Sequence, residues 1–186
     1  MNFSAVTPRP KSEATLAVVM IIIAKIMILH LIGRPVICDC GVLKLWEGTP
    51  SPAHNSQHFA DHYSFLHAAF GIGLFHLLAG LRPDWSMARL AIAVTASSAI
   101  WEVAENTPFI IDRFASWSSN LDYGGDSLAN SLGDTLFTLL GAAIAARLNW
   151  TLALFLVLAI EVAVYLLIGD GLVAGALRLL TGTSLA

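Results

Sequence analysis

Charged side chains are scarce in this chain, which excludes an ordinary soluble domain. Of its 186 residues, 12% are Asp, Glu, Lys or Arg and 56% are hydrophobic, whereas a soluble domain carries about 25% charge. A soluble protein of this size cannot hide so much apolar surface, and the mean hydropathy is +0.72. The composition therefore indicates helices embedded in lipid.

Basic runs and the usual motifs of nucleotide and nucleophile chemistry are missing as well. The formal net charge is −3, so the composition gives no sign of a nucleic-acid surface, and we expect no nucleic-acid partner. The sequence contains no GxSxG motif, no P-loop and no dinucleotide-binding fingerprint. Any chemistry must come from other residues.

Only two cysteines are present, Cys38 and Cys40, in a segment between the first two apolar runs. Their spacing is too short for a usual disulfide, and no second cysteine pair completes a zinc ribbon. We interpret this segment as a structural or lipid-facing loop. A metal site or a redox pair is the alternative interpretation.

Long apolar runs are abundant, and five of them are long enough to cross a bilayer, which needs roughly 20 residues. They cover residues 14–32, 63–80, 87–104, 128–146 and 151–168. A sixth run, 172–185, is too short to span straight and predicts an interfacial or re-entrant helix. For the first run a signal peptide is the alternative, although this run is longer than the usual signal-peptide core and no small-residue cleavage site follows it.

These runs predict an all-α fold, a polytopic transmembrane helix bundle of about five spans plus a short C-terminal helix. We expect one membrane-embedded domain, 14–186, after a short cytoplasmic tail, 1–13. Pro108 disfavours further helix, so residues 109–125 are expected to form a loop. Lys25 and His30 lie within the first run, where a charge is costly, and we expect them to face the bundle interior or to snorkel.

Basic residues favour a cytoplasmic N-terminus, because cytoplasmic loops carry an excess of Lys and Arg. The acidic residues and histidines of the loops then gather on or near the outer face. The basic residues on the cytoplasmic side are Arg9, Lys11, Arg82, Arg89 and Arg147, and those on the outer side are Arg34, Lys44, Arg113 and Arg178.

Five of the six histidines lie between positions 54 and 76, where the chain enters the second apolar run. His58 and His62 are four residues apart, so on a helix they would share one face and could grip a metal ion. His67, or an acid from another helix, would supply the third ligand. The alternative is a polar interfacial turn whose histidines face water.

Two carboxylates, Glu102 and Glu105, lie at the end of the third run. An ionisable group within a span is costly and rarely faces lipid, and two carboxylates at this spacing repel unless a proton or a cation joins them. Glu102 is therefore a candidate acid/base, a metal ligand or a partner of His67. The alternative is a structural hydrogen bond between helices or a helix-end charge near water.

Asp126, Asn130 and Asp134 recur every four residues and line one stripe of the fourth run. Asp126 could simply cap this helix. Asp134 lies eight residues further on, about 12 Å along the helix, so it should be buried and paired. We expect a site with His67, Glu102, Asp126 and Asp134 as catalytic residues.

A divalent metal is an open alternative in this site, with His58, His62, His67 and Glu102 as its candidate ligands. A shared centre predicts that His67, Glu102 and Asp126 cluster, whereas structural packing predicts separate local pairs. The identity and presence of the metal, the substrate and the oligomeric state do not follow from the sequence.

Four segments, GRPVICDCGVLKLW, NSQHFADHYSFLH, WEVAENTPFIIDRF and LDYGGDSLANSLGD, together resemble an uncharacterised family of bacterial inner-membrane proteins. The resemblance covers roughly residues 33–170 and implies a multi-pass protein of the inner membrane, with no established activity. The chain departs from the family at Leu66 and Phe70, where the family has Ser and His, and around Asp170. The phenylalanine weakens any metal model that needs an imidazole there and leaves His67 as the better candidate.

The Asp-x(5)-His entrance to a span, a Glu-bearing span and a Gly-Asp-x(7)-Asp helix are more distantly similar to the VanZ-like membrane proteins. This similarity suggests work on lipids or the cell envelope, although fold-level analogy says little about a reaction. We expect handling of a lipid or envelope intermediate by hydrolysis or group transfer, with membrane lipid as the partner. The alternative is a non-catalytic protein for packing, ion passage, or binding of a protein partner or a second copy.

Overall fold

The computed structural model describes residues 11–51, 53–115 and 123–181, and these residues form helices and loops without strands. The all-α fold expected from composition is confirmed. The helices of the described part are α1 (Lys11–Leu31), α2 (His62–Leu81), α3 (Met87–Glu105), α4 (Pro108–Ala115), α5 (Leu128–Ala145), α6 (Trp150–Ile168) and α7 (Leu172–Thr181).

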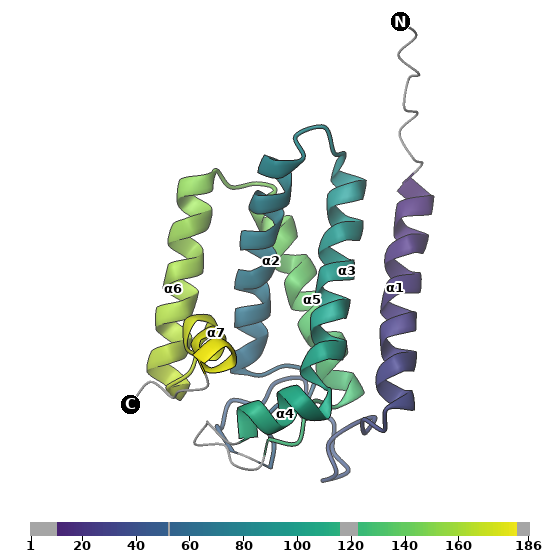
Figure 1. Ribbon diagram of the computed structural model, residues 1–186, viewed down its shortest axis with the longest axis vertical. Helices are drawn as coiled ribbons and strands as arrows, with labels where there is room; N and C mark the ends of the chain where they lie inside the picture. The colour runs from purple at the N-terminus through teal and green to yellow at the C-terminus, as the bar shows by residue number, and fades with distance from the viewer. Residues whose placement is uncertain (1–10, 52, 116–122, 182–186) are drawn as a thin grey trace, which may run out of the picture.

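Five of these helices, α1, α2, α3, α5 and α6, are long and apolar enough to cross a membrane. They stand side by side as a bundle (Figure 1), so the prediction of five spans is confirmed. In α1 and α6 only 11% of the most apolar 18-residue stretch is buried inside the protein. Large side chains such as Met20, Met27, Phe155 and Leu166 point outward, as expected of helices that face lipid.

The most extensive helix pair is α2 with α5, and small residues bring the two backbones close together. A Cβ atom added at Gly71 of α2 would overlap the carbonyl oxygen of Thr138, and one added at Gly141 of α5 would overlap that of Ala68. Membrane helices associate through such small residues because lipid supplies no hydrophobic driving force between them. This pair forms the centre on which the site is built.

Apolar and polar side chains occupy opposite halves of the bundle. Near the 82–86 turn the core is apolar and includes Phe75, Val94 and Ala153. Toward the other end the buried side chains become polar, and they include Glu102 and Asp134. Burying so many polar groups is costly unless they pair with one another, so this half needs a specific network.

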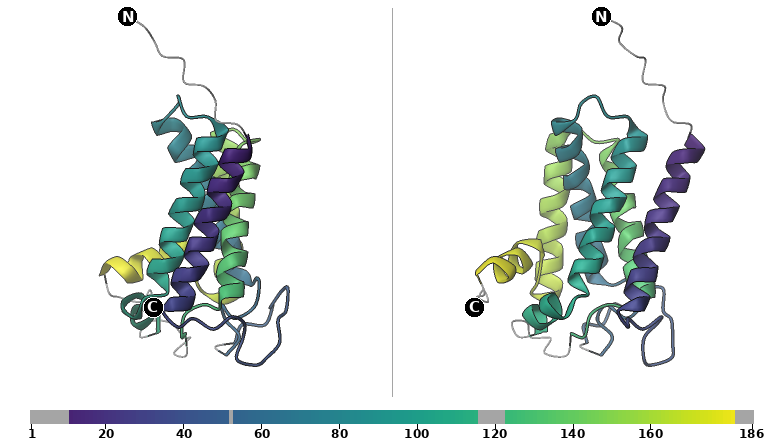
Figure 2. Two further views of the ribbon diagram at one scale, coloured as in Figure 1. Left: turned by 90° about the vertical axis from the view of Figure 1, so that its right-hand side faces the viewer. Right: turned by 45° about the vertical axis from the view of Figure 1, so that its right-hand side comes forward.

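Two short helices close the polar end of the bundle, where Figure 2 shows α4 and α7 on the side away from the first turn of α1. The expected loop 109–125 is wrong in part, because Pro108 begins α4. Proline is well tolerated at the first helical position, where its missing N–H would have no partner. Helix α7 projects sideways from the bundle next to the end of α6 (Figure 2), and two N–H groups of its first turn donate to Glu161, at 2.9 Å each.

The connections alternate between the two ends of the bundle. The turns 82–86 and 146–149 lie at the end where α1 begins, whereas residues 32–61, α4 and α7 lie at the other end (Figure 1). Of the expected tail, residues 1–10 lie outside the described part, and residues 11–13 belong to α1. The last residues of the sixth run, 182–185, also lie outside it.

Candidate functional site

His67 of α2 lies between two buried carboxylates from two other helices. Its Nδ1 atom is 3.3 Å from Oε1 of Glu102 on α3, and its Nε2 atom is 3.7 Å from Oδ2 of Asp134 on α5. Glu102 is fully buried and Asp134 is 3% exposed. The structure therefore brings together three of the four expected catalytic residues.

A hydrogen-bonded path leads from Asp134 to the start of α2. Ser64 donates to Asp134 at 2.5 Å and accepts from the backbone N–H of Asp61 at 3.2 Å. The Asp61 side chain caps α2 by accepting from the N–H of Tyr63 and also accepts from the N–H of Ser56, both at 2.8 Å. Burial, and then the Asp126 charge, raises the pKa of Asp61, so this cap is a poorly solvated carboxyl group.

Asp126 belongs to a second polar group beside the first. The amide of Asn106 donates to Asp126 Oδ2 at 2.6 Å and accepts from the N–H of Asp126 at 2.7 Å. The Tyr123 hydroxyl donates to Asp126 at 3.0 Å and to Glu105 at 3.5 Å. Burial, and then the Asp126 charge, raises the pKa of Tyr123 well above its usual range, which keeps the hydroxyl protonated as a donor.

The cap of α5 is Ser127 rather than Asp126. The Ser127 side chain accepts from the N–H of Asn130 at 3.1 Å, and Asp126 lies one residue before it. The interpretation of Asp126 as a helix cap is therefore wrong, because Asn106 and Tyr123 already occupy its carboxylate.

Lys25 reaches the same polar half from α1. It is 1% exposed, and its Nζ atom donates to the Ser131 carbonyl oxygen at 2.6 Å and to the Thr135 hydroxyl at 2.7 Å. Lys25 thus faces the bundle interior, whereas His30, near the end of the same helix, is exposed. A buried ammonium next to α5 offsets part of the negative charge of the site.

A cavity of about 280 Å³ opens beside His67. Polar groups of His67, Glu105, Tyr63, Tyr123 and Asp170 meet in its wall, and Tyr63 donates to Asp170 at 3.1 Å. Most of the remaining wall is apolar and comes from α2, α3, α4 and α7. Its apolar residues include Leu66, Phe70, Trp101, Phe114, Leu172 and Leu179.

His67, Glu102 and Glu105 also form a group that fits a metal ion, since one ligand atom from each lies within 4.8 Å of the others. Within the described part of the chain, both Glu102 oxygens and Glu105 Oε2 are buried without a hydrogen-bond partner. Three protein ligands with an open position are typical of catalytic metal sites. The same geometry also suits a proton shared between a histidine and a carboxylate.

The expected metal ligands His58 and His62 lie apart from this group. Helix α2 begins only at His62, so the helical spacing assumed for the pair is wrong, because the Asp61 cap sets the start of the helix. The His62 ring instead packs edge-on against Trp46. Burial, and then the Lys44 charge, lowers the pKa of His58.

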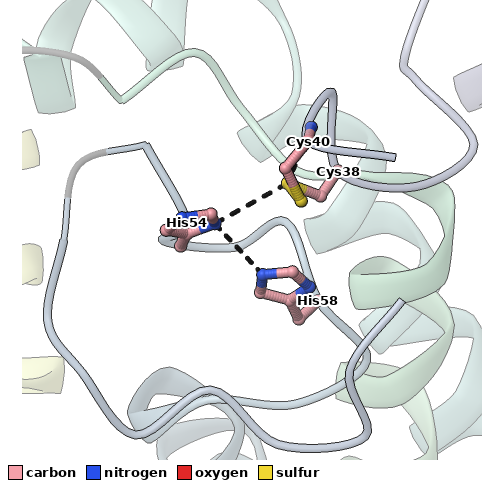
Figure 3. Close-up of side chains that lie close together, drawn as sticks. All are labelled: Cys38, Cys40, His54 and His58. Carbon is pink, nitrogen blue, oxygen red and sulfur yellow. Dashed lines mark hydrogen bonds between the residues drawn. A yellow bond between two sulfur atoms is a disulfide. The ribbon is translucent and has the colours of Figure 1, made fainter. Parts of the chain in front are cut away.

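His58 belongs to a different cluster, with His54, Cys38 and Cys40 (Figure 3). Cys38 and Cys40 form a disulfide, so the expectation drawn from their short spacing is wrong. A turn in which the N–H of Gly41 donates to the Cys38 carbonyl oxygen folds the segment back. It brings the two Cα atoms to 5.1 Å, within the usual disulfide range.

A family model described as "Protein of unknown function (DUF2585)" matches residues 29–184 of the chain. The chain belongs to the DUF2585 family. The matched range contains α2 to α7 and thus every site residue described above except Lys25. The expected membership of an uncharacterised family is confirmed, and the similarity to VanZ-like proteins stays a prediction.

Relatives of this DUF2585 chain come from several bacteria. A UPF0314 protein of Rhizobium meliloti is 40% identical over 167 residues, which cover 88% of this chain and 83% of the relative. A UPF0314 protein of Sphingopyxis alaskensis is 39% identical, with 83% of this chain and 82% of the relative covered. One of Paracoccus denitrificans is also 39% identical, covering 88% and 85%. No solved structure matches the chain.

Several functional candidates of this DUF2585 protein had no role assigned from the sequence. Ser64 links Asp61 to Asp134, and the Asp-x-x-Ser spacing of a helix start is a signal that could have identified it. Asn106 and Tyr123 hold Asp126, but their partners lie 20 and 3 residues away in sequence. No periodic pattern connects α3 to the segment before α5, so only the fold reveals these contacts.

Proposed function

We propose that this DUF2585 protein is an enzyme of the bacterial inner membrane that processes a lipid or cell-envelope intermediate by hydrolysis or group transfer. The basic residues of its turns favour a cytoplasmic N-terminus. In that orientation the cavity beside His67 opens toward the outer face of the membrane. The observation that carries the proposal is the placement of His67 between Glu102 and Asp134 beside this cavity.

The wall of the cavity supports a substrate with an apolar chain and a polar head. Phe70, Trp101 and Leu179 offer apolar contacts, whereas His67 and Glu105 are polar. Ligand sites are commonly apolar pockets with a few convergent polar groups. An acyl or prenyl chain would lie against the apolar wall, and the bond to be cleaved would face His67.

The proposed reaction uses His67 as the acid/base. In hydrolysis, His67 accepts a proton from water while the water oxygen bonds to the acyl carbon or phosphorus atom. The bond to the leaving oxygen breaks, and His67 returns the proton to that oxygen. Glu102, which faces Nδ1 at 3.3 Å, orients the ring and stabilises the positive imidazolium. The transferred proton is carried by Nε2, which is 3.7 Å from Asp134, and the Asp134 charge adds to the stabilisation of the imidazolium. In group transfer, an alcohol of the acceptor replaces water.

As an alternative within the proposal, a divalent cation held by His67, Glu102 and Glu105 would activate the attacking water. The buried carboxylate oxygens without hydrogen-bond partners favour it. A bound cation would lower the pKa of a coordinated water.

The test begins with elemental analysis of the detergent-purified protein, followed by assays against phospholipids and prenyl-linked envelope intermediates. His67→Gln and Glu102→Gln should abolish turnover, and a metal in the site should be lost from both. His76→Gln is the matched control, because His76 lies on the same helix but packs against Trp150. Full turnover by folded His67→Gln would refute the assignment of the site.

A non-catalytic role remains the alternative from another class. If no substrate is consumed while the lipid still binds, and Phe70→Ala weakens binding, the cavity is a binding site. Ion passage is tested separately in vesicles, where proton flux that depends on Glu102 would favour it over catalysis.

A further inference from the structure

We infer that Cys38, Cys40, His54 and His58 form a binding site for a thiophilic divalent cation such as Zn²⁺ when the disulfide is reduced. This site is separate from the one proposed around His67 and does not depend on that proposal. The disulfide is then the metal-free, oxidised form of the same four residues.

Geometry is the first argument for this site. One ligand atom from each of the four residues lies within 4.8 Å of the others. Around one Zn²⁺ the bonds to sulfur and nitrogen are about 2.3 and 2.0 Å, so neighbouring ligand atoms are roughly 3.3–3.8 Å apart. Only small movements separate the present arrangement from a tetrahedral Cys₂His₂ site.

The orientation of the imidazoles is the second argument. His54 Nδ1 is 3.7 Å from the Cys38 sulfur and 3.2 Å from His58 Nε2 (Figure 3). The His58 ring is fully buried. Metal binding through Nε2 places the ring proton on Nδ1, so the contact of Nδ1 with the backbone N–H of Lys44, at 3.4 Å, opens when the metal binds. His54 Nδ1 therefore lies between the Cys38 sulfur and His58 Nε2, so three of the four ligand groups already meet at one point.

The surroundings complete the site. Glu47 places a carboxylate 3.7 Å from His58 Nε2, which supplies negative charge next to a bound cation. The segment also braces the fold, because the carbonyl oxygens of Pro35 and Val36 accept from the first N–H groups of α5, at 2.8 and 3.1 Å. The cluster thus lies on backbone held in place by a spanning helix, as a metal site requires.

Reduction is chemically accessible because Cys40 is exposed, whereas Cys38 is buried. A phosphine attacks the Cys40 sulfur, the S–S bond breaks, and Cys38 leaves as a thiolate 3.7 Å from His54. Water supplies an oxygen atom to the phosphine oxide and protons to the two sulfurs. Zn²⁺ then displaces the two thiol protons and binds both thiolates with the two imidazoles.

The test compares oxidised and phosphine-reduced full-length protein in detergent, each equilibrated with Zn²⁺ and then freed of excess metal. We expect one more Zn²⁺ per chain after reduction. A metal held by His67, Glu102 and Glu105 would not produce this difference, because that site contains no thiol. With Co²⁺ as the probe, the reduced protein should gain a thiolate-to-cobalt charge-transfer band and tetrahedral d–d bands.

Variants then assign the ligands. Cys40→Ser should abolish the additional Zn²⁺, and His54→Gln should weaken its binding by at least about tenfold, since even second-shell changes cost about 10–100-fold. His62→Gln is the matched control, because His62 belongs to the same segment but packs against Trp46, and it should bind normally.

Alkylation of both thiols in reduced, folded wild type should have the same effect as Cys40→Ser, which keeps the test independent of the folding of that variant. Equal Zn²⁺ content in the oxidised and reduced proteins would overturn the inference. Retention of the additional metal by Cys40→Ser, or by the alkylated protein, would overturn it as well.

Discussion

The Nδ1 atom of His67 lies 3.3 Å from Oε1 of Glu102, and this contact joins α2 to α3 inside the polar half of the bundle. Neither helix alone creates the pair. His67 is on α2 and Glu102 is near the end of α3, so their meeting depends on the crossing of the two helices. The energetic coupling between the two side chains therefore measures whether the site is assembled.

A double-mutant cycle with His67→Gln and Glu102→Gln tests this coupling through the free energy of unfolding in detergent. We expect the double variant to be more stable than the sum of the single effects predicts, by roughly 0.5–1.5 kcal/mol, because each single change leaves a buried partner unpaired. Additive effects would mean that the two side chains do not interact.

Close packing of α2 on α5 predicts a marked difference between two glycines of α2. Gly71→Ala should destabilise the protein by about 1–3 kcal/mol, because the new methyl group overlaps the Thr138 carbonyl and the backbones must separate. Gly73→Ala is the matched control, since nothing lies within 4 Å of the added atom. The measurement is the midpoint of thermal unfolding of both variants. Equal midpoints would contradict the close packing of α2 on α5.

Lys25→Met tests how α1 is held against the bundle. The change removes two hydrogen bonds of a buried ammonium, to Ser131 and Thr135, and should cost about 1.5–3 kcal/mol. His30→Gln, at the exposed end of the same helix, should have little effect. Unchanged stability of Lys25→Met would show that α1 is held by its apolar contacts alone.

The pairing of the Glu47 carboxylate with Lys44 predicts a loss of stability in acid. The Lys44 hydrogen bond, followed by the N–H of Thr49, lowers the pKa of Glu47 from 4.5 to about 2. Because the folded state favours the ionised form of Glu47, the ionised carboxylate stabilises the fold. This stabilisation is fully present above pH 4.5 and disappears as the pH falls toward 2. Lys44 is 46% exposed, so solvent screens its interaction with Glu47. We therefore expect the ionised carboxylate to contribute about 1–2 kcal/mol to the free energy of unfolding, less than the pKa shift alone would imply.

The measurement is the midpoint of thermal unfolding between about pH 6 and pH 2, a range that spans the titration of this carboxylate. Glu47→Gln should lower the midpoint at the upper end of this range and bring it close to wild type at the lower end. Lys44→Met should reproduce this profile, because it removes the donor that lowers the pKa of Glu47. Parallel profiles for wild type and Glu47→Gln would contradict the assignment.

The sequence predicted the five spanning helices because lipid imposes a long apolar run on each of them. Shorter features depended on local contacts that such runs do not report. Pro108 begins α4 rather than preventing it, and the Asp61 cap starts α2 too late for His58 and His62 to share a face. A search for caps before assigning helical spacing would have separated these two histidines.

The candidate site was predictable in part for a similar physical reason. Buried ionisable residues in spans are costly, so His67, Glu102 and Asp134 stood out without any knowledge of their distances. Their partners did not stand out. Ser64 is an ordinary small residue, and its hydrogen bond to Asp134 exists only because α2 and α5 pack closely.

The reciprocal pair of Asn106 and Asp126 offers a test of the second polar group by exchange of the two side chains. Asn106→Asp faces one carboxylate with another in a buried place and should destabilise the protein by about 1–3 kcal/mol or more. Asp126→Asn should cost less, because its amide can turn and still accept from Tyr123.

The double variant Asn106→Asp with Asp126→Asn restores an amide opposite a carboxylate, and the carboxylate introduced on α3 can still accept from the N–H of residue 126. It loses the hydrogen bond of 2.9 Å from the Asn106 amide to the Glu102 carbonyl oxygen and places a carboxylate oxygen next to that carbonyl instead. We therefore expect the double variant to unfold at a higher temperature than Asn106→Asp alone. No recovery would mean that the hydrogen bond of Asn106 to the Glu102 carbonyl oxygen contributes more to stability than its pair with Asp126.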